Sequence, residues 1–165
     1  MLAMPIIVIF FKENGLTLTQ IMILQSVYSL TVALTEIPSG YFADFFGRKK
    51  SIIISTILSF CGYLIFSNYC SFEAFIIAEI LVALGGSLMS GADSALMYDS
   101  LKKLKKEERY TQIEGKSYAI GNFSESIAGL IGGLIASVSI VLPVQIQTID
   151  LFFSIPVAFS LVDIR

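Results

Sequence analysis

The sequence predicts an all-α membrane protein, built as a single bundle of six transmembrane helices. Apolar residues make up 55% of the 165 residues, 15% are charged, and the mean hydropathy is +0.80. Soluble domains usually carry more charge. Several apolar stretches approach the roughly 20 residues with which a helix crosses the hydrocarbon of a bilayer. The basic residues fall on alternate connections between these stretches, as a multi-pass chain requires.

The apolar stretches define the expected helices. The first stretch, MLAMPIIVIFF, is too short to cross a bilayer and lacks the basic flank and cleavage site of a signal peptide. We expect it to be the outer end of a truncated helix whose beginning precedes this sequence. The six expected helices, which together form one domain over 1–165, are residues 1–11, 18–43, 51–68, 74–99, 117–141 and 144–163.

The positions of Lys and Arg predict the orientation, because these residues are enriched in short cytoplasmic loops. Apart from Lys12, every basic residue lies in the segments 44–50 and 100–116 or at Arg165. We therefore expect both segments to be cytoplasmic loops of a protein in the cell inner (plasma) membrane. The basic run within 100–116 could also suggest nucleic-acid binding. Its position between two membrane helices favours a solvated loop instead, so no nucleic-acid partner is expected.

Enzymatic chemistry has little support in this sequence. The chain contains no histidine, and its two cysteines, Cys61 and Cys70, have neither disulfide-framework nor metal-site spacing. It has no Ser-His-Asp set, no glycine-rich phosphate loop and no paired motifs of an intramembrane aspartyl protease. We expect a protein that is not an enzyme and that holds no cofactor and no metal.

The connection between the second and third expected helices carries the most specific motif, G-x-x-x-D-x-x-G-R-K. It comprises Gly40, Asp44, Gly47, Arg48 and Lys49. The first glycine allows a neighbouring helix to approach, the second suits a tight turn, and the arginine can pair with a carboxylate near the membrane surface. A generic basic turn with glycines is the alternative. The spacing resembles the cytoplasmic signature between helices 2 and 3 of the major facilitator superfamily.

The resemblance extends into the fourth and fifth expected helices. Residues 90–101 look like helix 4 of bacterial drug-efflux members, in which an acidic residue partners the motif arginine; Asp99 holds the matching position. At two points the sequence departs from the pattern of the drug/proton antiporters in this superfamily. The fourth helix has no mid-helix arginine, and the run from Gly129 to Gly133 lacks the proline of the Gly-Pro-x-x-Gly-Gly element.

The resemblance implies an N-terminal half of the facilitator fold, made of two inverted three-helix repeats. It also implies secondary active transport of a small molecule by alternating access, coupled to an ion gradient, with protons as the expected ion. The implied partners are the lipid bilayer, a small-molecule substrate, and either a missing C-terminal six-helix half or a second copy. The alternative is a truncated inactive fragment, or a membrane protein with a structural or assembly role.

Three acidic residues inside the expected spans, Glu36, Asp93 and Glu125, are candidates for proton coupling or substrate binding. Charge is costly in hydrocarbon, so such residues usually face the bundle interior or a cavity. Desolvation favours the neutral form of a carboxyl group, which then serves as a proton carrier. The alternative is a protonated acid that is only hydrogen-bonded to a nearby serine. Glu79 and Asp150 lie nearer the outer side and could line a wet vestibule.

Overall fold

The computed structural model describes residues 3–161, and all regular secondary structure within that range is helical. A short helical segment, formed by η1 (Met4–Ile6) and α1 (Ile7–Glu13), comes first. The longer helices are α2 (Leu18–Phe46), α3 (Arg48–Asn68), α4 (Phe72–Lys103), α5 (Tyr110–Ala136, preceded by η2, Glu107–Arg109) and α6 (Leu142–Ser160). Each of these five is long and apolar enough to cross a membrane, which confirms the multi-pass helical class.

Local sequence signals determine where several helices begin and end. Thr17 caps α2: its hydroxyl accepts the Gln20 N–H at 3.3 Å, and the Gln20 side chain accepts the Thr17 N–H at 2.9 Å. Ser71 caps α4 by accepting the Ala74 N–H. Between α2 and α3, Gly47 adopts a φ of 99°, which residues with a side chain rarely adopt. A glycine at this position therefore allows two long helices to join without a loop.

The closest helix packing is between α3 and α4, where small residues let the backbones approach. A Cβ added to Gly85 would collide with the Ser59 side chain and lie 2.9 Å from the Ser55 carbonyl oxygen. A Cβ added to Gly62 would lie 2.6 Å from Val82 Cγ2. The Ser55 hydroxyl also donates a 2.7 Å hydrogen bond to the Gly85 carbonyl oxygen. The α3–α4 pair is therefore the centre of the bundle, and α2 packs on α4 while α6 packs on α3.

An aromatic cluster anchors the short N-terminal helix at the end of the bundle remote from Gly47. Phe10 and Phe11 of α1 pack on Phe66 of α3 and Phe75 of α4, with ring centroids 5.2–6.5 Å apart. All four rings are buried. Aromatic rings bury a large apolar area, so this cluster holds α1 on the α3–α4 pair although α1 is only two turns long.

The helices extend beyond the apolar spans that the sequence predicts. The expected loop 44–50 is helical except at Gly47, and helical structure enters 100–116 from both sides, leaving only 104–106 outside it. At its other end α5 stops at Ala136 rather than at 141. The backbone hydrogen bonds of a helix also form outside the membrane, and Lys, Arg and Glu are good helix formers. A helix therefore need not end where its apolar span ends.

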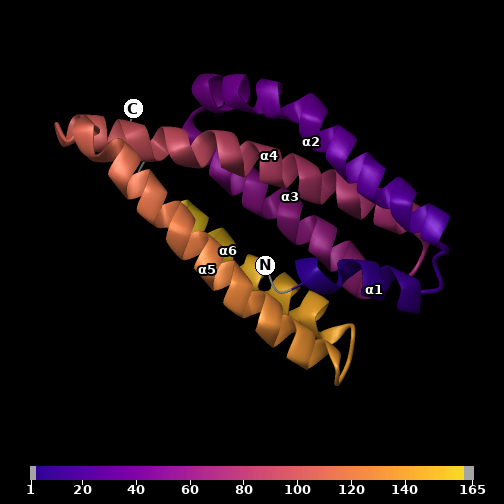
Figure 1. Cartoon of the computed structure of the whole chain (residues 1–165). Coiled ribbons are helices and arrows are strands. Elements are labelled where there is room, and N and C mark those ends of the chain that lie inside the picture. Colours follow the sequence, from indigo (N-terminus) through magenta and orange to yellow (C-terminus); the bar gives the residue numbers. More distant parts are fainter. Residues whose placement is uncertain (1–2, 162–165) are drawn as a thin grey trace.

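The helix α5 diverges from the group formed by α2, α3 and α4. In Figure 1, α5 follows the end of α4 and then runs obliquely away from α2, with α6 behind it. Gly132 is its one buried residue among those that the structure describes. One side of α5 therefore stands open toward α4, and the candidate site lies on this side.

Candidate functional site

Arg48, the first residue of α3, forms ion pairs with two other helices. Its Nη1 lies 3.0 Å from Asp99 Oδ2 on α4, and its Nη2 donates to Asp44 Oδ1 on α2 at 3.4 Å. The Asp99 contact is an ion pair without hydrogen-bond geometry, and Nη1 is shielded from solvent. Because Gly47 turns the chain directly before it, Arg48 can reach carboxylates on both helices. The ion pairs of Arg48 therefore join α2, α3 and α4 at this end of the bundle, and a role of this junction in gating stays a prediction.

The other motif residues contribute less to this junction. The α4 backbone approaches α2 at Gly40, as expected: a Cβ added to Gly91 of α4 would lie 3.5 Å from the Gly40 nitrogen and 3.6 Å from its Cα, whereas a Cβ at Gly40 itself would meet no described atom within 4 Å. Tighter approach occurs at Gly62 and Gly85, which face the α3–α4 contact. Lys49 is partly exposed and forms no ion pair within the described part of the chain.

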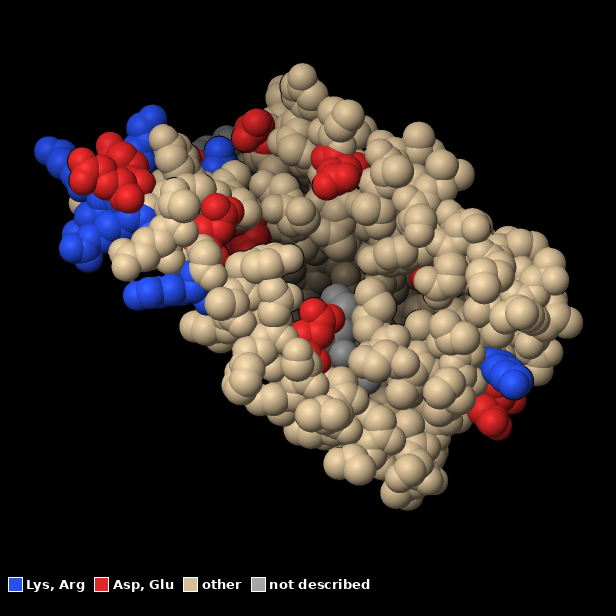
Figure 2. All heavy atoms as spheres, viewed as in Figure 1, with Lys and Arg blue, Asp and Glu red and all other residues tan. Residues whose placement is uncertain are grey.

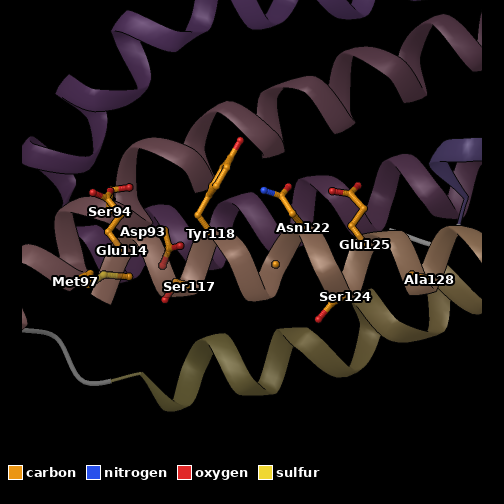
Figure 3. A pocket seen from close by; sticks show the side chains of 11 residues that line it. Asp93, Ser94, Met97, Glu114, Ser117, Tyr118, Asn122, Ser124, Glu125 and Ala128 are labelled. Atoms are coloured by element: carbon orange, nitrogen blue, oxygen red, sulfur yellow. The ribbon is translucent and has the colours of Figure 1, made fainter. Parts of the chain in front are cut away.

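A cavity of about 590 Å³ lies between α4 and residues 114–128 of α5, and we call it the α4–α5 cavity. It is lined by Asp93, Ser94 and Met97 from α4 and by Glu114, Ser117, Tyr118, Gly121, Asn122, Ser124, Glu125 and Ala128 from α5. Figure 3 shows Tyr118, Asn122 and Glu125 projecting from the same side of α5, with Ser124 pointing away. Their spacing of four and three residues accounts for this shared face.

The surface around this hollow is acidic rather than basic. Figure 2 shows acidic side chains around the central hollow, while most basic side chains gather at one end of the molecule. Among the described residues that line the α4–α5 cavity there is no Lys or Arg. Carboxyl groups, hydroxyls and an amide in one open cavity can accept protons, attract cations and hydrogen-bond a polar solute.

The three candidate carboxyl groups do not form one site. Asp93 and Glu125 face the same α4–α5 cavity, as expected of acids in a membrane span. Glu36 lies on α2 outside this cavity, where its side chain is exposed, so the interior or cavity position expected for it is absent. Hydropathy indicates that α2 is a span, but it does not indicate which side of α2 packs on protein.

Of the four titratable residues in the lining of the α4–α5 cavity, Glu114 and Tyr118 are absent from the sequence-based candidates. Glu114 was missed because α5 begins at Tyr110 rather than at 117, which adds about two turns of helix, whereas Tyr118 lies within the expected span and was not singled out there. The Tyr110 hydroxyl donates a 2.6 Å hydrogen bond to Glu114 Oε1. A polar residue at every fourth position from Tyr110 to Asn122 is the signal that could have found this face.

Glu79 does not line an outer vestibule. Its residue is 6% exposed, which makes it the one buried acidic residue in the described part of the chain. Within that part no hydrogen bond or ion pair reaches its side chain. It shares a buried face of α4 with Ala78 and Val82, so helical phase rather than distance from the helix end decides its burial.

Comparison with known proteins decides the family. The sequence profile of the Major Facilitator Superfamily (MFS) matches residues 1–163. The chain belongs to this superfamily. The motif of residues 40–49 predicted this membership correctly.

Two relatives of this MFS chain carry transporter names. An uncharacterized transporter of Buchnera aphidicola subsp. Schizaphis graminum (strain Sg) is 33% identical over 96 residues, which are 57% of this chain and 23% of that protein. An uncharacterized MFS-type transporter of Bacillus subtilis (strain 168), YxaM, is 33% identical over 88 residues, which are 53% of this chain and 22% of that protein. The match therefore spans less than a quarter of each relative's length. Neither name specifies drug efflux, which stays a prediction.

Proposed function

We propose that this MFS chain forms one six-helix half of a secondary active transporter that moves a small molecule by alternating access. The observation that carries the proposal is the α4–α5 cavity, an open acid-lined hollow in a bundle of membrane helices. In transporters built from two such bundles, substrate sites lie between the halves near the middle of the membrane. The α4–α5 cavity would supply one wall of such a site.

The proposed mechanism assigns different tasks to different helix contacts. The α3–α4 pair, held by close glycine contacts, moves as a rigid unit. The Arg48 ion pairs to Asp44 and Asp99 hold the inner end closed in the outward-open state. The helices α1–α3 and α4–α6 form the two inverted repeats, and the Arg48 end faces the cytoplasm of a cell whose inner (plasma) membrane holds the protein.

A proton gradient drives this transport in our proposal, with Asp93 and Glu125 as candidate proton carriers because both face the cavity. Glu36 remains a third candidate, through contact with a second bundle. The test replaces each with its amide, as Asp93→Asn, Glu125→Gln and Glu36→Gln. At least one replacement should abolish pH-driven uptake while leaving substrate exchange without a gradient. Full coupling after replacement of all three would refute their assignment.

The partner that completes the site is either a second six-helix half or a second copy of this chain. Along α5 the exposed side chains include Phe123, Leu130 and Leu134 beside the polar cavity face. A carboxyl-lined cavity that opened directly to lipid would be costly. A second bundle against this face would enclose the carboxyls and leave a polar pathway between the halves.

Reconstitution of the 165-residue chain into liposomes tests this proposal. An imposed proton gradient and a panel with a cationic drug, a neutral sugar and an organic anion provide the readout. At one chain per liposome we expect no uptake, and we expect uptake once a second copy or a second six-helix half is present. Saturable uptake by a single chain would refute the half-transporter assignment. Absence of uptake in every assembly would favour the alternative, an inactive fragment or a structural membrane protein.

Reading the coding DNA on both sides of this segment provides an independent check. A reading frame that continues into six further spans would identify the second wall of the pathway. Stop codons on both sides would leave a second copy as the partner, and the assembly experiment then decides whether that pairing transports.

A further inference from the structure

A second, much smaller cavity lies within the α2–α3–α4 group, apart from the α4–α5 cavity. It has a volume of about 40 Å³. Four of its lining side chains are polar: Gln25 and Tyr28 from α2, Tyr63 from α3 and Glu79 from α4. The rest of the lining is apolar and comes from the N-terminal segment, α3 and α4. We call this space the Glu79 cavity.

The carboxyl group of Glu79 is the unusual member of this set. It is buried, it faces the cavity, and no hydrogen bond or ion pair from a described residue reaches it. No Lys or Arg is among the described residues that line the cavity. An ionised carboxylate that is buried without a partner costs several kcal/mol, whereas a neutral acid costs far less. A residue in this position therefore needs a positive ligand.

The size and lining of the cavity limit what that ligand can be. A volume of about 40 Å³ holds one to a few waters, because one water needs roughly 10–15 Å³ on this measure. A transported organic solute does not fit. A metal cation needs a shell of several oxygen ligands, and half of the eight lining residues are apolar. A proton needs only one carboxyl oxygen.

We propose that Glu79 is a buried proton-binding site, in which the carboxyl group takes up a proton when the Glu79 cavity is closed and releases it when the cavity opens to water. Protonation balances as R–COO⁻ + H⁺ → R–COOH, with the proton bound to a carboxyl oxygen. The titratable groups that face Glu79 are Tyr28 from α2 and Tyr63 from α3. Met4 and Ile7 face it from the N-terminal segment and carry none.

The cavity sits where helix movement would change its hydration. Glu79 and Tyr63 belong to the α3–α4 pair, whose close contact at Gly62 lies next to the cavity through Val82. Tyr28 belongs to α2, which packs on this pair less extensively. Movement of α2 away from the pair would admit water to the carboxyl group and favour its ionised form. The role of this protonation in coupling rests on the proposed transport function, whereas proton binding itself does not.

Infrared spectroscopy of the full chain in liposomes tests the proposal without requiring transport. The spectrum distinguishes the C=O stretch of a protonated carboxyl from the carboxylate stretches, and it is recorded across a pH titration. The chain has 13 acidic residues, so the wild-type spectrum minus that of Glu79→Gln isolates one group. The matched control is Glu73→Gln, which removes an exposed acid from the first turn of the same helix.

We expect the Glu79→Gln variant to lose one protonated-carboxyl band that indicates an apolar environment, and the Glu73→Gln variant to retain it. Circular dichroism establishes that each variant is folded, and Glu79→Asp should retain a titrating band. The proposal is overturned if the band persists in Glu79→Gln, or if the group stays ionised throughout the titration. It is also overturned if sodium, rather than pH, controls the band.

A transport assay then separates this site from the proposed function. If the assembled wild-type protein shows gradient-driven uptake, Glu79→Gln should lose the response to the proton gradient while retaining substrate exchange, and Glu73→Gln should retain both. Undiminished gradient-driven uptake by Glu79→Gln would overturn the coupling role. Absence of uptake by the wild type contradicts the transport function and leaves the infrared result to decide the proton site.

Discussion

Replacement of Arg48 by alanine should loosen the inner end of the bundle, because this side chain pairs with carboxylates on α2 and α4. The Arg48 and Asp99 side chains are 23% and 32% exposed, so their 3.0 Å ion pair is partly desolvated and contributes about 1–3 kcal/mol. The Asp44 side chain is 70% exposed, and its 3.4 Å contact contributes about 0–1 kcal/mol. A loss of about 1–3 kcal/mol shifts a two-state equilibrium by roughly 5–150-fold.

The assay measures the distance between the inner ends of α2 and α4 by electron paramagnetic resonance. Nitroxide labels are placed on cysteines at Tyr41 and Lys102, two exposed positions, after Cys61 and Cys70 are replaced by serine. In the assembled transporter Arg48→Ala should raise the population with the longer distance, which corresponds to the inward-open state. Added salt should raise the longer-distance population of the wild type only in part, because the Asp99 pair is partly buried and is therefore only partly screened.

Three further variants make the result specific. Asp99→Asn should reproduce most of the effect, Asp44→Asn should produce little of it, and Lys50→Ala should produce none, because Lys50 is exposed and forms no ion pair with a described residue. Unchanged populations in Arg48→Ala would refute the gate. A larger effect from Asp44→Asn than from Asp99→Asn would contradict the ranking by burial.

Three other predictions follow from packing and orientation. Gly85→Ala should destabilise the fold by about 1–3 kcal/mol, whereas Gly86→Ala should be tolerated, since a Cβ meets α3 atoms at the first position and nothing within 4 Å at the second; unfolding in mixed detergents measures both. Ser55→Ala should cost about 0.5–1.5 kcal/mol in the same assay by removing the hydrogen bond to α4. In intact cells an impermeant thiol reagent should label Cys70, which is exposed, far more than Cys61; labelling of Cys70 only in inverted vesicles would reverse the orientation.

The amino-acid sequence by itself was sufficient to predict a multi-pass membrane protein and to identify its family. Run length and hydropathy are local properties, and they are sufficient to identify spans such as 74–99 because crossing hydrocarbon imposes a length. The motif of residues 40–49 has a fixed spacing, so it identified the superfamily without knowledge of the fold. The same motif placed Arg48 and Asp99 as partners, because a resemblance carries pairings that spacing alone does not.

Tertiary structure alone decided which carboxyl groups are buried. Glu79 and Glu125 both lie within apolar runs, yet Glu79 faces the α2–α3–α4 interior while Glu125 faces an open cavity. In a membrane-spanning helix every side can be apolar, because lipid and protein interiors offer similar surroundings, and the sequence therefore has a weak signal for the packed side. The packed side depends on which helices approach each other, which here follows from the backbone contacts at Gly62 and Gly85. Those contacts join residues that are distant in the chain, so only the folded arrangement could assign Glu79 to the small cavity within the α2–α3–α4 group.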